Sequence, residues 1–271
     1  MDKKIAIYTC LTGGYDILQE PAVVDTEHFD YFVFTDDVDA VPPGSIWQAI
    51  LIPELQGKNT RQNRIRRARR AKLLPHEILP GYDWSVFMDA NLRITGEEFY
   101  AIVLGAVLDE KVFSGLRHPL RDCVYDELRE CYLKDRISTR EAFRHHRFFR
   151  SIGMSRHAGL LETNVLLRNH LRRSVIELDS KWWRILSDGS TRDQLALTPA
   201  LSLLGYRLPV GEDNVPSYLL DKSLSARNVP FIEYTKHTET HGRVPGRIDF
   251  KNLRYNIRLG FRKLVLWLFL K

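Results

Sequence analysis

The stretch Tyr82-Asp83-Trp84-Ser85-Val86-Phe87-Met88-Asp89-Ala90-Asn91 places an apolar run directly before two oxygen-bearing side chains. The run has the length of a buried strand, and Asp89 and Asn91 follow it at positions i and i+2. In open α/β sheets, ligands bind beyond the carboxyl ends of the strands. A carboxylate and an amide carbonyl suit a hard divalent cation that also holds diphosphate oxygens. The same residue types also cap helices and make turns, so the motif alone leaves both interpretations open.

Further strands and helices are predicted to alternate around this stretch. The pattern predicts strands over residues 4–10, 31–34, 46–52, 112–116 and 160–167. It predicts helices over residues 59–74 (with Pro75 as the stop signal), 96–108, 171–186 and 192–204, and a mixed, mainly helical segment over 122–149. This alternation favours an α/β fold with a mostly parallel sheet flanked by helices. We expect one domain over residues 1–250 and an appended helical tail over residues 251–271.

The composition is that of an ordinary globular protein. Of 271 residues, 44% are hydrophobic and 27% charged, which is too apolar for a disordered chain. No apolar run reaches the roughly 20 residues of a membrane span, and the start has no signal-peptide stretch. Three cysteines without zinc spacing favour a reducing compartment. These features predict a cytoplasmic protein.

Positive charge is concentrated in two segments. Seven basic and no acidic residues lie between Arg61 and Lys72, and six more lie in residues 251–271, against a net charge of +6. Such segments attract phosphate, lipid head groups or nucleic acid. Helical spacing places Arg66, Arg69 and Arg70 on one face, so we expect these three to converge, although a merely solvated face would show the same pattern.

Several blocks of sequence resemble one family. They are residues 7–16 (Ile-Tyr-Thr-Cys-Leu-Thr-Gly-Gly-Tyr-Asp), 30–36 (Asp-Tyr-Phe-Val-Phe-Thr-Asp), 72–76 (Lys-Leu-Leu-Pro-His), 87–91 (Phe-Met-Asp-Ala-Asn) and 118–127 (His-Pro-Leu-Arg-Asp-Cys-Val-Tyr-Asp-Glu). Their order is similar to that of the glycosyltransferase-like family of plant pectin and mucilage synthesis proteins and bacterial polysaccharide-locus proteins. Residues 161–168 and the pair Asp193-Gln194 also resemble the retaining transferases related to glycogenin. The resemblance spans residues 5–205.

The resemblance implies a GT-A (Rossmann-like) fold, a nucleotide-sugar donor such as a UDP-sugar, and Mn²⁺ or Mg²⁺ as cofactor. The sequence departs from the usual Asp-x-Asp motif, because Asn91 replaces the second carboxylate. One negative charge is lost there, which puts the dependence on metal in doubt.

The resemblance also implies a nucleotide-binding loop after the first strand. Thr9, Gly13, Gly14 and Tyr15 are expected to cradle the nucleotide, with Tyr15 stacking on the base, unless this is a plain tight turn. Asp36 would bind the base or ribose, or serve as a surface turn residue.

The same resemblance selects Arg69 and Lys72 as the basic residues that reach the donor phosphates. Asp89 and Asn91 would hold the metal. The third metal ligand would be a late histidine, with His241 preferred over His237, unless both are structural.

Four more polar residues are candidates for the sugar and the acceptor. Glu162 and Asn164 interrupt an apolar strand, where burial without partners would be costly. Asp193 and Gln194 are expected to face the sugar, with a helix N-cap as the alternative for Asp193. If the reaction inverts, Asp193 or Glu162 would be the general base. If it retains, the leaving phosphate would help to deprotonate the acceptor.

Remaining motifs receive plainer interpretations. His118, Arg121 and Glu127 line the acceptor side or brace the site. His145 and His146 are expected at the surface, and Trp182-Trp183 in packing. Apolar residues at helical spacing in 251–271, beside a stripe of arginines, predict a basic amphipathic helix on an anionic membrane. Packing on the body, or against a second copy of the chain, is the alternative.

The sequence therefore predicts a glycosyltransferase that moves a sugar from a nucleotide-sugar to a glycan or lipid-linked acceptor in polysaccharide biosynthesis. A non-catalytic nucleotide-sugar or glycan-binding protein with a decayed metal site is the alternative. A nucleic-acid-binding protein is a third class, disfavoured because no nucleic-acid module is recognisable. The oligomeric state is left open.

Overall fold

A computed structural model gives the fold of the chain. It describes residues 4–14, 16–52, 60–188, 192–208, 216–220, 229–235 and 250–269, and at 61–62, 250–257 and 268–269 it describes the backbone alone. Tyr15, His237 and His241 lie outside the described residues.

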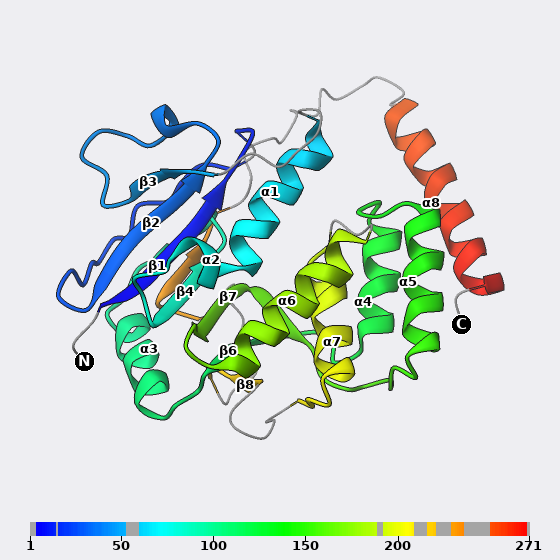
Figure 1. The fold of residues 1–271 in the computed structure, drawn as a ribbon. Helices are drawn as coiled ribbons and strands as arrows, with labels where there is room; N and C mark the ends of the chain where they lie inside the picture. Colours follow the sequence, from blue (N-terminus) through cyan, green and yellow to red (C-terminus); the bar gives the residue numbers. More distant parts are fainter. Residues whose placement is uncertain are drawn as a thin grey trace.

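The described strands form a seven-stranded sheet of order β3-β2-β1-β4-β7-β6-β8 and a two-stranded sheet of β5 and β9 (Figure 1). The strands are β1 (Ile5–Leu11), β2 (Phe29–Thr35), β3 (Gln48–Leu51), β4 (Trp84–Met88), β5 (Leu92–Ile94), β6 (Phe113–Arg117), β7 (Leu161–Asn169), β8 (Ser217–Tyr218) and β9 (Ile232–Tyr234). Only β7 is antiparallel to its neighbours in the large sheet. The expected α/β fold with a mostly parallel sheet is confirmed.

Helices cover both faces of this sheet. They are α1 (Arg61–Leu73), α2 (Pro75–Ile78), α3 (Glu98–Leu108), α4 (Val124–Leu133), α5 (Thr139–Ser151), α6 (Arg173–Ser187), α7 (Gln194–Leu203) and α8 (Phe250–Phe269), with a 3₁₀ turn η1 (Val38–Ala40). Helices α1, α6 and α7 pack on one face, while α3 packs on the other. Helices α4, α5 and α8 lie beside α7 as a third group (Figure 1).

The central strands are apolar throughout because both of their faces are buried. In β4, Val86 and Met88 point to the α3 side, whereas Phe87 points to the α1 and α6 side. By the same alternation along β1, Ile7 points to the α3 side of the sheet and Tyr8 points to the α1 and α6 side. The continuous apolar run that precedes Asp89 therefore marks a strand in the middle of the sheet.

Several local expectations are corrected by the structure. Pro75 ends α1 but also begins α2, because proline is tolerated at the first position of a helix. The short strands β5, β8 and β9 had no periodic signal long enough to predict them. His145 and His146 are buried rather than at the surface, since both face the core of α4 and α5 near Phe149 and Tyr125. Trp182, by contrast, is buried in packing as expected.

A buried arginine joins the sheet to two of its helices. Arg168 in β7 is fully buried, and its Nη1 lies 3.2 Å from Oδ1 of Asp179 in α6. Its Nη2 donates to the Tyr8 hydroxyl at 2.6 Å and to the Lys72 carbonyl at 2.7 Å. The Tyr8 hydroxyl also donates to that carbonyl, at 2.7 Å. Because the last carbonyls of a helix lack partners within it, these contacts anchor the end of α1.

The tail helix packs on the body through one face. Val265 and Leu266 of α8 are buried with residues of α4 and α5. Arg262 donates to the Tyr132 carbonyl and pairs with Asp135. Within the described ranges, no helix combines the length and apolar character needed to cross a bilayer.

All three cysteines are free thiols. Burial raises the pKa of Cys10 to about 12, despite the opposing effect of Lys72 and Arg69. The thiol therefore stays protonated at neutral pH and is a poor nucleophile.

The buried Arg168–Asp179 pair gives a first prediction. We expect Arg168→Met to lower the free energy of unfolding by about 3–5 kcal/mol, because it strands the Asp179 carboxylate in the core. Arg173→Ala is the control: its side chain is exposed and pairs with Glu177 across one helical turn, so its loss should cost under about 1 kcal/mol. Urea unfolding of both variants measures the difference.

The pH dependence of the same variant follows from Asp179. Burial raises the pKa of Asp179 to about 7 even though Arg168 opposes that shift. Without Arg168 the folded state favours the protonated carboxyl still more, whereas the unfolded chain ionises near pH 4. Arg168→Met should therefore lose stability as the pH rises from 4 toward 7 and above. An equal stability at pH 5 and pH 8 would contradict a stranded carboxylate.

Candidate functional site

The candidate site lies at the carboxyl ends of β1, β2 and β4. The loop after β1 contains Gly13 and Gly14, with φ of 64° and 61°. These are left-handed conformations that glycine adopts without strain. The Gly13 amide donates to both carboxylate oxygens of Asp36, at 2.9 and 3.1 Å. Asp36 follows β2, so it fixes the loop across two strand ends.

A side chain at Gly13 would crowd α1. A Cβ built there would lie 3.0 Å from Nε of Arg64, in the first part of that helix. The Arg64 side chain is flexible, so the positive φ of Gly13, more than this contact, favours glycine here; the approach brings a guanidinium against the backbone of the loop. Backbone amides beside an arginine form an environment suited to phosphate oxygens.

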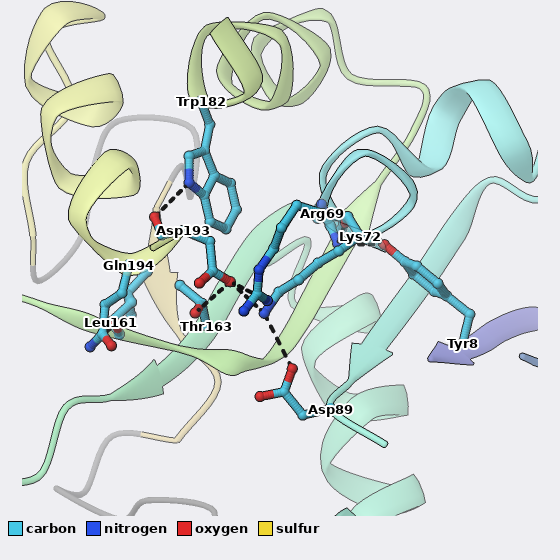
Figure 2. Close-up of polar contacts among 10 residues, drawn as sticks. Tyr8, Arg69, Lys72, Asp89, Leu161, Thr163, Trp182, Asp193 and Gln194 are labelled. Atoms are coloured by element: carbon cyan, nitrogen blue, oxygen red, sulfur yellow. Dashed lines mark hydrogen bonds and ion pairs between the residues drawn. The ribbon is translucent and has the colours of Figure 1, made fainter. Parts of the chain in front are cut away.

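Lys72 lies at the centre of the site between two carboxylates. Its Nζ is 2.6 Å from Oδ2 of Asp193 and 3.3 Å from Oδ1 of Asp89 (Figure 2). The lysine is almost fully buried, whereas the Asp89 side chain is 41% exposed. Helix α1 supplies the lysine and the turn after β4 supplies Asp89. The ammonium therefore lies between the buried carboxylate of Asp193 and the partly exposed carboxylate of Asp89.

Asp193 is held from several elements. Its Oδ2 also lies 3.0 Å from Nη1 of Arg69 and accepts a hydrogen bond from the Thr163 hydroxyl at 3.1 Å. Its backbone carbonyl accepts from the Trp182 indole at 2.8 Å (Figure 2). Burial alone would raise the pKa of Asp193, but Arg69, Lys72 and Arg192 outweigh burial and hold that pKa well below its usual range. Asp193 therefore stays ionised. It makes no side-chain cap to α7, which it precedes.

Other predicted residues flank Asp193 and Thr163 along the chain. Gln194 follows Asp193 and donates from Nε2 to the Leu161 carbonyl at 3.3 Å. Glu162 and Asn164 lie on β7, on either side of Thr163. The hydroxyl of Thr9 and Oδ1 of Asn164 are buried without a hydrogen-bond partner among the described residues. Unpaired buried polar atoms are costly, so a ligand would satisfy them.

The basic side chains of α1 contact separate partners and do not converge on one point. Arg66 donates to the Ser187 carbonyl of α6 at 3.4 Å, and Arg70 pairs with Glu77 of α2 at 2.5 Å. Only Arg69 and Lys72 reach Asp193. The expectation of three converging arginines was wrong because each contacts a different segment: α6, Asp193 just before α7, and α2.

The predicted metal ligands form an incomplete set. Asn91 is largely buried and its backbone carbonyl accepts from the amide and hydroxyl of Thr235, at 3.0 and 2.9 Å. No three histidine, cysteine or acidic side chains come together to hold a metal in the described part of the chain. The Lys72 ammonium already neutralises Asp89. The described residues therefore do not fit a divalent metal by themselves, and metal dependence stays a prediction.

His118, Arg121 and Glu127 form a second polar group near the same edge of the sheet. Nε of Arg121 lies 2.7 Å from Oε2 of Glu127, which is buried at the start of α4. Nδ1 of His118 accepts from the Arg121 amide at 3.0 Å. The Cys131 thiol donates to the other oxygen of Glu127 at 3.2 Å. These contacts tie the loop after β6 to α4.

Three residues of the site were missed at the level of sequence. Thr163 lay between two singled-out polar residues, and the alternation of a strand could have separated its face from theirs. Arg192 precedes Asp193, is partly buried and helps to lower the pKa of Asp193, and Arg64 meets the glycine loop. Nothing in the spacing of either arginine distinguishes it from a surface residue.

Comparisons with known proteins give a family for most of the chain. Residues 1–210 match the model of the family described as TOD1/MUCI70, glycosyltransferase-like domain. No curated protein matches. Among solved structures, the chain is similar to an apo structure described as the bifunctional glycosyltransferase WbbM, with 12% identity and a TM-score of 0.44. The match covers 74% of this chain and 38% of that one, so the chain spans well under half of that protein's length.

The family match covers most of the chain, including every described element that supplies the Lys72 cluster. The glycine loop, the turn after β4 and the start of α7 all lie within it. The chain belongs to the TOD1/MUCI70 glycosyltransferase-like family.

Proposed function

We propose that this chain is a glycosyltransferase that uses a nucleotide-sugar donor, with a UDP-sugar as the first candidate. One observation carries the proposal: Arg69 and Lys72 converge with Asp89 and Asp193 at the carboxyl edge of the sheet. Family membership supports glycosyl transfer in general. The finer assignment rests on the chemistry of these side chains.

The donor diphosphate would bind between the glycine loop and α1. Arg64 borders the Gly13 backbone there, and the Arg69 side chain is 25% exposed, so a ligand can reach it. Breaking the bond between sugar and diphosphate leaves negative charge on the departing phosphate. Fixed cations at that position stabilise the charge as it develops.

Asp193 is better suited to organising the site than to taking a proton. Two cations hold its carboxylate, and a carboxylate with a strongly lowered pKa is a weak base. We assign it to fixing Arg69 and Lys72 and to accepting a hydrogen bond from the donor sugar. Glu162 is the remaining carboxylate that we predicted as general base, should the reaction invert. The acceptor would be a glycan or a lipid-linked glycan.

A divalent metal, if bound, would supply further positive charge to the diphosphate. Asp89 and Asn91 would contribute to its ligands together with His241, which lies outside the described residues. The described residues already supply Lys72 and Arg69 as fixed positive charges. We therefore expect nucleotide binding to persist, at reduced affinity, when metal is removed.

The exposed side of α8 supports peripheral association of the protein with a membrane surface. Phe261, Leu264 and Trp267 are 58%, 51% and 64% exposed. Lys263, which is also exposed, lies among them. An apolar row flanked by positive charge is typical of helices that lie on anionic bilayers. We propose an anionic membrane surface as the partner of this side of α8.

Donor binding is tested by thermal unfolding with UDP. We expect UDP to raise the melting temperature of the wild-type protein, with or without added MnCl₂, because it binds the folded state. Arg69→Gln should weaken binding roughly 10- to 100-fold, as expected for a lost hydrogen bond to a charged group. Arg70→Gln, on the same helix but paired with Glu77, is the matched control. Equal responses of the two variants would contradict the proposed phosphate contact.

Turnover separates the enzyme from a binding protein on the same fold. We expect wild-type protein to hydrolyse or transfer from at least one nucleotide sugar, and Asp89→Ala to lose that activity. Binding of UDP without turnover of any nucleotide sugar would favour the binding protein.

Asp193 gives a pH-dependent stability prediction. Asp193→Asn should cost about 3–5 kcal/mol at pH 7, because the buried Lys72 loses its closest counter-charge. The lowered pKa of Asp193 makes its contribution full above about pH 4 and progressively lost below. Urea unfolding should therefore show the gap between wild type and variant shrinking as the pH falls below 4. A gap that is constant with pH would contradict the ion-paired role.

Membrane association is tested by sedimentation with lipid vesicles. We expect the protein to sediment with vesicles containing phosphatidylglycerol and far less with phosphatidylcholine alone. Phe261→Ser combined with Leu264→Ser should abolish this binding. Leu108→Ser is the control, since Leu108 is 78% exposed, more than either residue, but lies on α3. Unchanged sedimentation of the double variant would exclude this side of α8.

A further inference from the structure

A surface hollow opens at one end of the α4–α5 pair. Its volume is about 340 Å³. Its lining comes from the first turn of α4, the last turns of α5 and the loop that follows α5: Tyr125, His146, Arg150, Gly153, Met154 and Arg156. Tyr125, His146 and Met154 are buried, and the two arginines are exposed.

The lining is cationic and contains no acidic residue. Within the described parts of the chain, neither Arg150 nor Arg156 forms an ion pair with a carboxylate. The guanidinium of Arg156 lies 5.0 Å from the centre of the Tyr125 ring. Burial lowers the pKa of His146, and Arg150 and Arg156 lower it further, so the imidazole is neutral and can donate one N–H. The hollow thus presents two guanidinium groups and one neutral donor.

The topology places this hollow at the same edge of the sheet as the Lys72 cluster. Strands β4 and β6 both run antiparallel to β7, so they end at one edge. The chain leaves β6 there, enters α4 through residues 118–123, and returns along α5 to the loop over residues 152–160. That loop leads into β7, where Thr163 donates to Asp193. The lining residues therefore belong to the segments that connect the carboxyl end of β6 to the start of β7.

We propose that this hollow binds a phosphoryl group carried by the acceptor. Two guanidinium groups match the charge of a phosphate monoester, which is close to −2 at neutral pH, whereas a single carboxylate would leave one arginine uncompensated. A volume of about 340 Å³ exceeds a phosphate alone and leaves room for the group attached to it. This assignment rests on the proposed function, since it names the acceptor class for the transfer.

Methionine methyl groups can test the two sites separately. The chain has three methionines: Met154 lines the hollow, Met88 lies next to Asp89 at the donor site, and Met1 is terminal. The full-length protein would be labelled with [methyl-¹³C]methionine and titrated with glucose 6-phosphate, as a sugar phosphate, and with glycerol 3-phosphate, as a lipid head-group analogue. Glucose and glycerol are the uncharged counterparts, and UDP is the donor-site ligand.

We expect at least one phosphate compound to shift the Met154 signal saturably, while the uncharged counterparts leave it unchanged. Arg150→Ala and Arg156→Ala should each weaken that response tenfold or more, since each removes a charge-assisted contact. Arg147→Ala, an exposed arginine of α5 outside the lining, should leave it unaltered. A stronger response to glycerol 3-phosphate indicates a lipid phosphate, and a stronger response to glucose 6-phosphate indicates a phosphorylated glycan.

The two proposals fail in different ways in this experiment. An unmoved Met154 signal, or one that shifts equally in wild type and both hollow variants, overturns the phosphoryl site even if UDP shifts Met88. The donor site is tested by thermal unfolding with UDP, and a melting temperature that UDP leaves unchanged counts against that site, whatever Met154 does. The Met88 signal also shows directly that each variant is folded.

Discussion

The site depends on one buried lysine that is shared by two aspartates. Lys72 Nζ contacts Asp193 and Asp89, which belong to elements more than 100 residues apart in sequence. Its backbone carbonyl is fixed from behind by Tyr8 and Arg168. A buried ammonium needs counter-charges, and both carboxylates gain a cation in return. The start of α7, the turn after β4 and the end of α1 are therefore held in one arrangement.

This arrangement also sets the electrostatics of the proposed reaction. In a site with a complete acidic motif, a divalent cation would meet the diphosphate. Here Asn91 removes one carboxylate and Lys72 lies 3.3 Å from the other, so the protein provides part of the positive charge itself. Arg69 extends that charge toward solvent. The hollow at the end of the α4–α5 pair is a second cationic site. Its lining contains Arg150 and Arg156 and no carboxylate.

Much of the fold could be predicted from the sequence, because central strands and their covering helices leave strong local patterns. The apolar run before Asp89, the helix of residues 59–74 and the segment 160–167 all correspond to described elements. The antiparallel direction of β7 and the short strands β5, β8 and β9 leave no such pattern, since they depend on contacts between distant segments. The burial of His145 and His146 was missed for the same reason: a basic stretch gives no sign of which face packs inward.

The sequence by itself determined the residue types of the site and their order: a glycine loop, a basic helix, an acidic turn after a buried strand, and the Asp193-Gln194 pair. Only the tertiary structure decided which of them meet. Helical spacing grouped Arg66, Arg69 and Arg70, but their partners on α6, just before α7 and on α2 separated them. Side-chain periodicity fixes a direction relative to one element, whereas an ion pair depends on where a second element lies. The pairing of Lys72 with Asp193 is therefore a property of the packed chain.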